Sequence, residues 1–131
     1  MDTVLDAHGL MVYLEREAGY EVVKSILERA LEGHVSLLMT TVNVGEVLYI
    51  VLRERGQKKA REIEGIIKNL PITLVSVDLD IAREAARFKA HNKMSYADCF
   101  AAALAKQHHA ALVTGDPEFK AVEEEIQICW V

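Results

Sequence analysis

Acidic residues stand at four points where a predicted strand passes into a helix or where a predicted helix begins: Asp6, Glu46, Asp98 and Asp116. Parallel strands end at a common edge of their sheet, so we expect these side chains to converge there. Carboxylates at close range repel one another unless they take up protons or a cation lies between them. An all-oxygen set favours Mg²⁺ or Mn²⁺, and such a site typically serves phosphate chemistry.

Each acid also has a simpler interpretation as a helix cap. Asp6 and Asp116 directly follow predicted strands and could each be an N-cap. Asp98 lies three residues after a serine, as in a capping box, and Glu46 lies three residues after Asn43. Capping alone requires neither a shared edge nor an all-carboxylate set. The joint pattern therefore favours a metal site.

The elements that must position these acids alternate between strands and helices. Apolar runs predict strands at 3–5, 35–39, 72–77, 111–113 and 126–130. Helical spacing predicts helices at 7–14, 20–31, from a cap at Thr41 or Asn43 to 53, at 57–69, 78–90 and 95–108, and a short helix from 117. Strands that are apolar throughout indicate a sheet buried on both faces. We expect a three-layer α/β/α fold with a parallel sheet of about five strands, in one domain over residues 1–131.

Composition narrows the class of protein. With 51% apolar and 27% charged residues among 131, the chain is typical of a globular domain and not of a disordered one. No apolar run is long enough to span a bilayer, and the N-terminus lacks the basic lead of a signal peptide. Cys99 and Cys129 are expected to be reduced thiols, which predicts a cytoplasmic protein without membrane association.

The net charge of −5 argues against non-specific binding of nucleic acid through overall charge. Local charge differs, because one basic cluster contains Arg53, Arg55, Lys58, Lys59 and Arg61, and a second contains Arg83, Arg87, Lys89, His91 and Lys93. These clusters are either solvated helix faces or a rim that contacts phosphates around the acidic centre.

The predicted helix that carries Glu46 is apolar on almost every side from Val42 to Leu52. A helix of this kind is normally buried all round, which a small domain seldom achieves alone. Either neighbouring helices cover it, or a second copy or another partner does.

Four segments together resemble the motifs of PIN domains, specifically the small ribonuclease toxins of the VapBC toxin–antitoxin type. They are VLDA at 4–7, NVGEV at 43–47, SYADCFAAA at 95–103 and LVTGDPEF at 112–119. The resemblance covers nearly the whole chain in the family's order. One departure is His8, which stands where the family usually has a small hydroxyl residue.

The resemblance implies an acidic pocket at the carboxyl edge of the sheet and Mg²⁺- or Mn²⁺-dependent endonucleolytic cleavage of RNA. It also implies homodimers and inhibition by a small antitoxin, whose C-terminal segment wraps the toxin and can place a basic side chain in the pocket. By position, the catalytic and metal-binding residues would be Asp6, Glu46, Asp98 and Asp116. Thr114 and Asn43 would support them.

The resulting hypothesis is an endoribonuclease in which Glu46 binds metal or orients the attacking water, and RNA is positioned through its backbone. The predicted RNA contacts are Arg53, Arg55, Lys58 and Lys59. One alternative is a haloacid dehalogenase-type phosphatase, although His8 occupies the place where that class needs a second aspartate. Another is a non-catalytic PIN-like module that only binds RNA or a protein.

Overall fold

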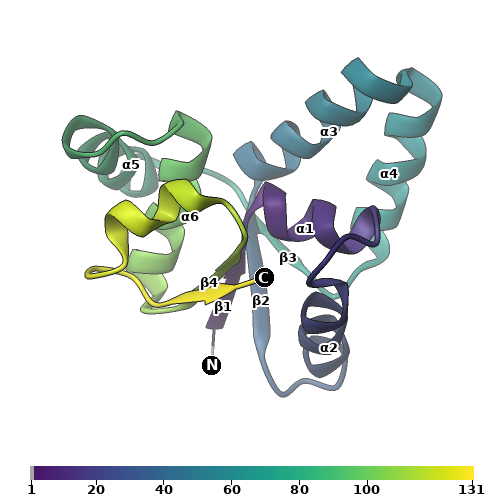
Figure 1. Cartoon of the computed structure of the whole chain (residues 1–131), viewed down its shortest axis with the longest axis horizontal. Coiled ribbons are helices and arrows are strands. Elements are labelled where there is room, and N and C mark those ends of the chain that lie inside the picture. Colours follow the sequence, from purple (N-terminus) through teal and green to yellow (C-terminus); the bar gives the residue numbers. More distant parts are fainter. Residues whose placement is uncertain (1) are drawn as a thin grey trace.

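The computed structural model describes residues 2–131, in which five parallel strands form one sheet with helices on both faces (Figure 1). The elements are β1 (Asp2–Leu5), α1 (Ala7–Leu14), α2 (Tyr20–Leu31), β2 (Ser36–Thr40), α3 (Thr41–Arg55), α4 (Gln57–Asn69), β3 (Thr73–Val75), α5 (Leu79–His91), α6 (Tyr96–His108), β4 (Ala111–Thr114), the 3₁₀ helix η1 (Pro117–Val122) and β5 (Ile128–Trp130). The strand order is β3-β2-β1-β4-β5. The predicted α/β/α fold with a five-stranded parallel sheet is confirmed.

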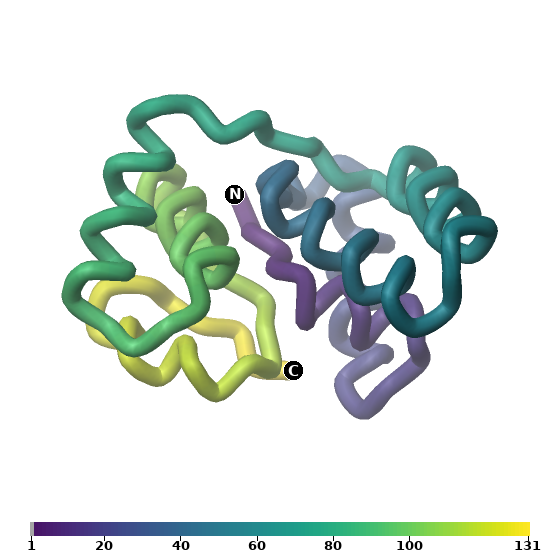
Figure 2. The backbone as a smooth tube through the Cα atoms, turned by 90° about the horizontal axis from the view of Figure 1, so that it is seen from above, coloured from purple at the N-terminus to yellow at the C-terminus, as the bar shows by residue number. Residues whose placement is uncertain are grey.

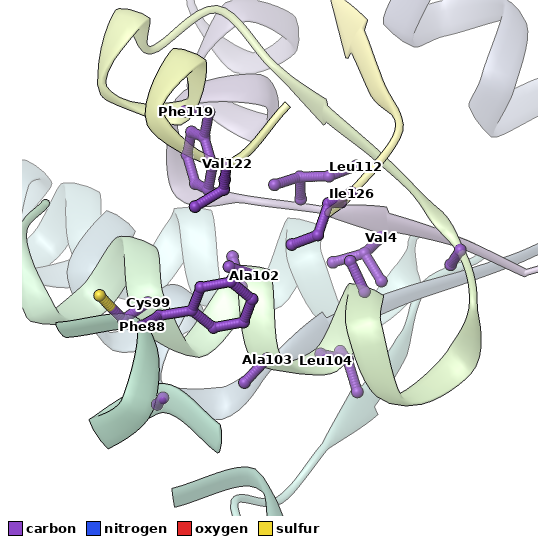
Figure 3. Close-up of a cluster of buried hydrophobic side chains, with 14 of the residues drawn as sticks. Val4, Phe88, Cys99, Ala102, Ala103, Leu104, Leu112, Phe119, Val122 and Ile126 are labelled. Carbon is purple, nitrogen blue, oxygen red and sulfur yellow. The ribbon is translucent and has the colours of Figure 1, made fainter. Parts of the chain in front are cut away.

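The sheet is buried on both faces because successive residues of its inner strands enter different cores. In β1, Val4 packs with α5, α6 and η1, whereas Leu5 packs with the helices α1 to α4. In β4, Leu112 and Val113 divide in the same way. Figure 3 shows the first of these cores, and Figure 2 shows α5 and α6 on one side of β1 with α3 and α4 on the other. Burial of each such aliphatic side chain stabilises the fold by roughly 1.5–3 kcal/mol.

The expected bounds need small corrections at the sheet edges and at one helix start. The outer strands β3 and β5 are three residues each and shorter than predicted. The helix α3 is capped by Thr40, and neither Thr41 nor Asn43 is its N-cap. Thr40 is still extended as the last residue of β2, so its hydroxyl is free to accept the N–H of Asn43 at 3.1 Å.

Two features of the helices bear on the site. In α1, a Cβ at Gly9 would lie 2.8 Å from the carbonyl oxygen of Val113, so glycine allows this helix to approach β4. In α3, Val47 and Val51 are buried, but Tyr49 and Leu52 are 56% and 48% exposed. Neighbouring helices therefore cover the apolar α3 only in part. Within residues 2–131, no helix has both the length and the apolar character needed to cross a membrane.

Candidate active site

Hydrogen bonds hold the side chain of Asp6 between the start of α1 and the end of β4. It lies one residue beyond β1 and is 1% exposed. Its Oδ1 accepts the N–H of Gly9 at 2.7 Å and caps α1, and its Oδ2 accepts the hydroxyl of Thr114 at 2.6 Å. The same Thr114 oxygen accepts the N–H of Asp116 at 3.0 Å. Thr114, predicted as a supporting residue, thus joins the first and last aspartates.

Three carboxylates form the tightest acidic group. Asp98, Asp116 and Glu118 each offer an oxygen within 4.8 Å of the others. Asp98 lies in the first turn of α6, whose N-cap is Ser95, and Asp116 caps η1 by accepting the N–H of Glu118 at 2.9 Å. Asp6 and Glu46 lie near this group but outside it.

Glu118 is a site residue that the sequence interpretation missed. Its side chain accepts the N–H of Ser95 at 3.0 Å, which connects η1 to the start of α6. The available signal was its position two residues after Asp116, in the first turn that follows Pro117. An acid at this point has an ordinary explanation in the helix dipole, so nothing in the sequence separated it from a solvated residue.

Asn43 connects the helices that carry Glu46 and Asp98. It is fully buried at the start of α3. Its side-chain amide donates to the carbonyl of Ala97 in α6 at 3.0 Å, and its oxygen accepts the hydroxyl of Thr40. The predicted supporting role of Asn43 corresponds here to a bridge between two helix starts.

We expect Asn43→Ala to lower the free energy of unfolding by about 2–3 kcal/mol. The substitution removes the hydrogen bonds of the Asn43 side chain to the carbonyl of Ala97 and the hydroxyl of Thr40, and loss of one partner of a buried polar group costs about 1–3 kcal/mol. Urea denaturation measures the change. The matched control is Asn92→Ala, which removes a single amide bond to Phe88 at the end of α5 and should cost less. Equal losses for the two variants would contradict the bridge.

Two carboxylate oxygens of the site stand out because they are buried and without a partner within residues 2–131. They are Oε1 of Glu46 and Oδ2 of Asp98. A buried unpaired acceptor is costly, and native proteins rarely leave one without a ligand, an ion or a proton.

The pKa values of the site carboxyl groups also show that their charged forms are destabilised in the folded protein. Burial raises the pKa of Asp98 far above its ordinary value, and the adjacent Asp116 and Glu118 carboxylates raise it further. Burial also raises the pKa of Asp6 to about 6, although hydrogen bonds from Thr114 and Gly9 favour its charged form. The pKa of Glu46 is raised by burial and by the charges of Asp116 and Glu118. Asp98 therefore retains its proton at neutral pH unless a cation replaces it, and the raised pKa values of Asp6 and Glu46 show that burial disfavours their charged forms as well.

The donor set fits a hard divalent cation. All the candidate ligands are carboxylate oxygens. Three residues offer oxygens within reach of one ion, and one oxygen each of Asp98 and Glu46 is buried without a partner. The described residues form no comparable group that includes a histidine or cysteine, and both cysteines are free thiols. The helix-cap interpretation of Asp6 and Asp116 is also correct, so these residues combine capping with membership of the acidic site.

A cleft of about 560 Å³ opens beside the carboxylates. Its lining is mostly acidic and apolar: Ala7, His8, Met11, Glu15, Glu17, Glu46, Ile50, Glu54, Arg55, Asp98 and Asp116. Of the four predicted RNA contacts, Arg55 lines the cleft, whereas Arg53, Lys58 and Lys59 lie outside its lining. In the second basic cluster, the two arginines are engaged in ion pairs, Arg83 with Asp80 and Arg87 with Glu125.

His8, the departure from the usual motif, is anchored at the edge of this cleft. Its Nδ1 accepts the N–H of Gly115 at 3.2 Å. A Cβ at position 115 would lie 2.5 Å from the imidazole Cε1, so glycine makes room for the ring. His8 therefore bridges β1–α1 and β4–η1 at a position where the family usually has a small hydroxyl.

The structure resembles toxins of known structure over almost its entire length. VapBC2 of Rickettsia felis, solved bound to a DNA fragment of its promoter, matches with a TM-score of 0.80 and 13% identity, covering 100% of this chain and 99% of that chain. DNA-bound VapBC of Salmonella typhimurium matches with a TM-score of 0.76 and 14% identity, covering 98% of this chain and 97% of that chain. VapC20 of Mycobacterium tuberculosis is described as a sarcin-ricin loop cleaving toxin. It matches with a TM-score of 0.71 and 15% identity, covering 92% of this chain and 94% of that chain.

Sequence comparison adds one finding. No curated protein sequence matches the chain. The family model of the PIN domain matches residues 3–125, which include every acidic residue of the site. The chain therefore belongs to the PIN domain family.

Proposed function

We propose that this PIN domain is a Mg²⁺- or Mn²⁺-dependent endoribonuclease and the toxin of a type II toxin–antitoxin pair. The observation that carries the proposal is the group of Asp98, Asp116 and Glu118 within 4.8 Å, next to buried oxygens of Glu46 and Asp98 that lack partners. Such a set is costly as a structural device alone, because removing buried carboxylates from water requires compensation.

The residues divide into ligands and residues that position them. Asp98, Asp116 and Glu118 would hold the cation, and Glu46 and Asp6, which lie outside this group, would bind it through water or orient the attacking water. The hydroxyl of Thr114 hydrogen-bonds to both the Asp6 carboxylate and the backbone N–H of Asp116, which holds these two residues in position. Asn43 connects the start of α3 to α6. A bound divalent ion supplies a more acidic water and stabilises charge that develops on a phosphate.

RNA is proposed as the substrate because of the family and one structural relative. VapC20, with the same fold, is described as cleaving the sarcin-ricin loop. The predicted RNA contacts Arg53, Arg55, Lys58 and Lys59 lie at the junction of α3 and α4, and of these four Arg55 alone lines the acidic cleft and is proposed to contact RNA. Contacts of this kind would position an RNA backbone without reading its bases.

Partners and location follow from the same proposal. The structural relatives include VapBC complexes, which supports a small antitoxin as the partner of this chain. The exposed Tyr49 and Leu52 on α3 support a homodimer whose partner copy covers them. Free cysteines fit a reducing cytoplasm, and the family match over residues 3–125 fits one domain.

The test is an RNA cleavage assay with purified protein. We expect fragments from structured and unstructured RNA with Mg²⁺ or Mn²⁺, and none when EDTA removes the ion. Structured RNA should include a stem-loop, because shape and exposed loops are the usual basis of RNA recognition. Uncut RNA at micromolar protein in both ions would overturn the proposal.

A non-catalytic binding module remains the second candidate because of one specific observation. Asp6 and Asp116 are both helix N-caps, so the presence of these two acids can be explained without a catalytic role. The unpartnered oxygens of Glu46 and Asp98 receive no explanation from this candidate. A protein that binds RNA in a mobility-shift assay but yields no cleavage product with either ion would favour it.

A further inference from the structure

We infer that Arg55 forms a phosphate-binding site in the cleft away from the proposed metal ligands Asp98 and Asp116, and that Glu15 pairs with this guanidinium until RNA displaces it. The inference rests on the proposed nuclease function. It selects one residue from the basic cluster as the substrate contact and assigns to an acidic residue a competing role in RNA binding.

The pair connects the ends of two helices. Arg55 is the last residue of α3, and Glu15 is the C-cap of α1. Arg55 Nη2 lies 2.7 Å from Glu15 Oε2, and both side chains line the cleft. Figure 1 shows α1 and α3 starting near each other at the sheet and running out on the same side of it. The ion pair therefore lies within the cleft lining, at the end of α3 opposite to Glu46.

The distance along α3 sets the role of Arg55. Glu46 stands nine residues before Arg55 in the same helix, which corresponds to about 13 Å along the helix axis. Ile50 and Glu54 follow Glu46 at helical spacing and also line the cleft. A phosphate bound by Arg55 is therefore distant from a phosphate bound at the carboxylates. Arg55 should contribute to binding of the RNA strand and not to the chemical step.

The charge of the cleft lining explains why the Arg55 guanidinium is important for RNA binding. The cleft lining contains six carboxylates, and within the described part of the chain Arg55 is its one arginine or lysine: the acids are Glu15, Glu17, Glu46, Glu54, Asp98 and Asp116. A polyanion that enters so acidic a cleft needs a cation beyond the metal site. Arginine suits phosphate because its planar fork can donate two parallel hydrogen bonds.

Glu15 can exchange with a phosphate at low cost. The Arg55 and Glu15 side chains are 48% and 26% exposed, and an ion pair in contact with water contributes at most about 1 kcal/mol. Phosphate oxygens offer Arg55 the same hydrogen bonds. Glu15 therefore acts as an intramolecular competitor that weakens RNA binding without preventing it.

Two of the neighbouring basic residues, Arg53 and Lys59, have other partners, and Arg53 provides a matched control. Arg53 donates to the hydroxyl of Tyr49 at 2.8 Å, stacks on that ring and lies 3.6 Å from Glu54. Lys59 lies 3.5 Å from Glu62 of its own helix. Arg53→Ala removes the same charge from the same turn of α3 as Arg55→Ala, but from outside the cleft lining.

The test measures RNA binding with cleavage switched off. The probe is a fluorescein-labelled, unstructured single-stranded RNA of mixed sequence, followed by anisotropy in Mg²⁺. All proteins carry Asp116→Asn, because asparagine caps helices as well as aspartate does. We expect Arg55→Ala to weaken binding roughly tenfold and to lower the slope of log K against log salt by about 0.7. Arg53→Ala should change binding less than twofold, and Glu15→Gln should tighten it two- to threefold.

The opposite effects of Arg55→Ala and Glu15→Gln on RNA affinity distinguish a role in substrate binding from a purely structural role. If the pair only supported the fold, Arg55→Ala and Glu15→Gln would lower the melting temperature together and shift RNA binding in the same direction. That result would overturn the inference, as would equal binding by Arg55→Ala and Arg53→Ala. Cleavage by the protein without Asp116→Asn tests the nuclease proposal separately, so active protein with no effect at Arg55 refutes this inference alone.

Discussion

Asp98→Asn should reduce RNA cleavage by at least about 100-fold with the fold intact. Asparagine keeps the size of the side chain but removes the charge from the centre of the Asp98, Asp116 and Glu118 group. Loss of one preorganised electrostatic group at a reaction centre typically costs 10²–10³ in rate. The Ser95 cap of α6 survives the change, because it uses the backbone N–H of residue 98 and not its carboxylate.

The measurement is single-turnover cleavage of RNA in Mn²⁺, together with a thermal melt to establish folding. Asp78→Asn is the matched control, since Asp78 caps α5 by accepting the N–H of Ile81 at 2.9 Å and lies outside the cleft lining. Asparagine is an equally good cap, so this variant should cleave at the rate of the unmodified protein. Cleavage by Asp98→Asn as fast as by Asp78→Asn would refute the assignment of the acidic site.

The sequence predicted the sheet and the aspartates at its edge for a physical reason. Strands buried on both faces are apolar throughout, and the strands that precede Asp6 and Asp116 were recognisable on that ground. Parallel strands end at one edge, so the proximity of those two aspartates followed from topology. The Thr114 hydroxyl that joins them could be anticipated only through the family resemblance.

Other parts of the site depend on tertiary packing and were not predictable from local patterns. Glu118 joins Asp98 because η1 packs against the start of α6, which no spacing in the sequence specifies. Arg55 meets Glu15 because α1 and α3 leave the sheet side by side. The cap of α3 was misassigned because β2 continues to Thr40, so the hydroxyl one residue earlier than expected occupies the N-cap position.

Without metal, the free energy of unfolding should fall as the pH rises from about 5 to about 8.5. In the folded protein the pKa of Asp6 is about 6 against an ordinary value of 3.8, and that of Asp98 is raised as well. A raised carboxyl pKa means that the folded state binds more protons than the unfolded state within this window. The stabilisation from Asp6 is complete below pH 3.8 and is lost as the pH rises through 6. It corresponds to about 3 kcal/mol, and Asp98 extends the loss to higher pH.

Mg²⁺ should reverse this trend, because deprotonated carboxylates are its ligands and an ion that binds only the folded state stabilises it by mass action. Melting temperatures at about pH 5, 7 and 8.5, with EDTA or with a few millimolar Mg²⁺, measure both effects. The gain from Mg²⁺ should be smallest at pH 5, where protons compete for the same oxygens, and largest at pH 8.5. Asp98→Asn should flatten the metal-free profile above pH 7, since it removes the acid that titrates highest, and should diminish the gain from Mg²⁺. A metal-free profile that rises with pH, or a Mg²⁺ effect equal at all three values, would show that these carboxylates are stable as charged groups on their own and do not form a cation site.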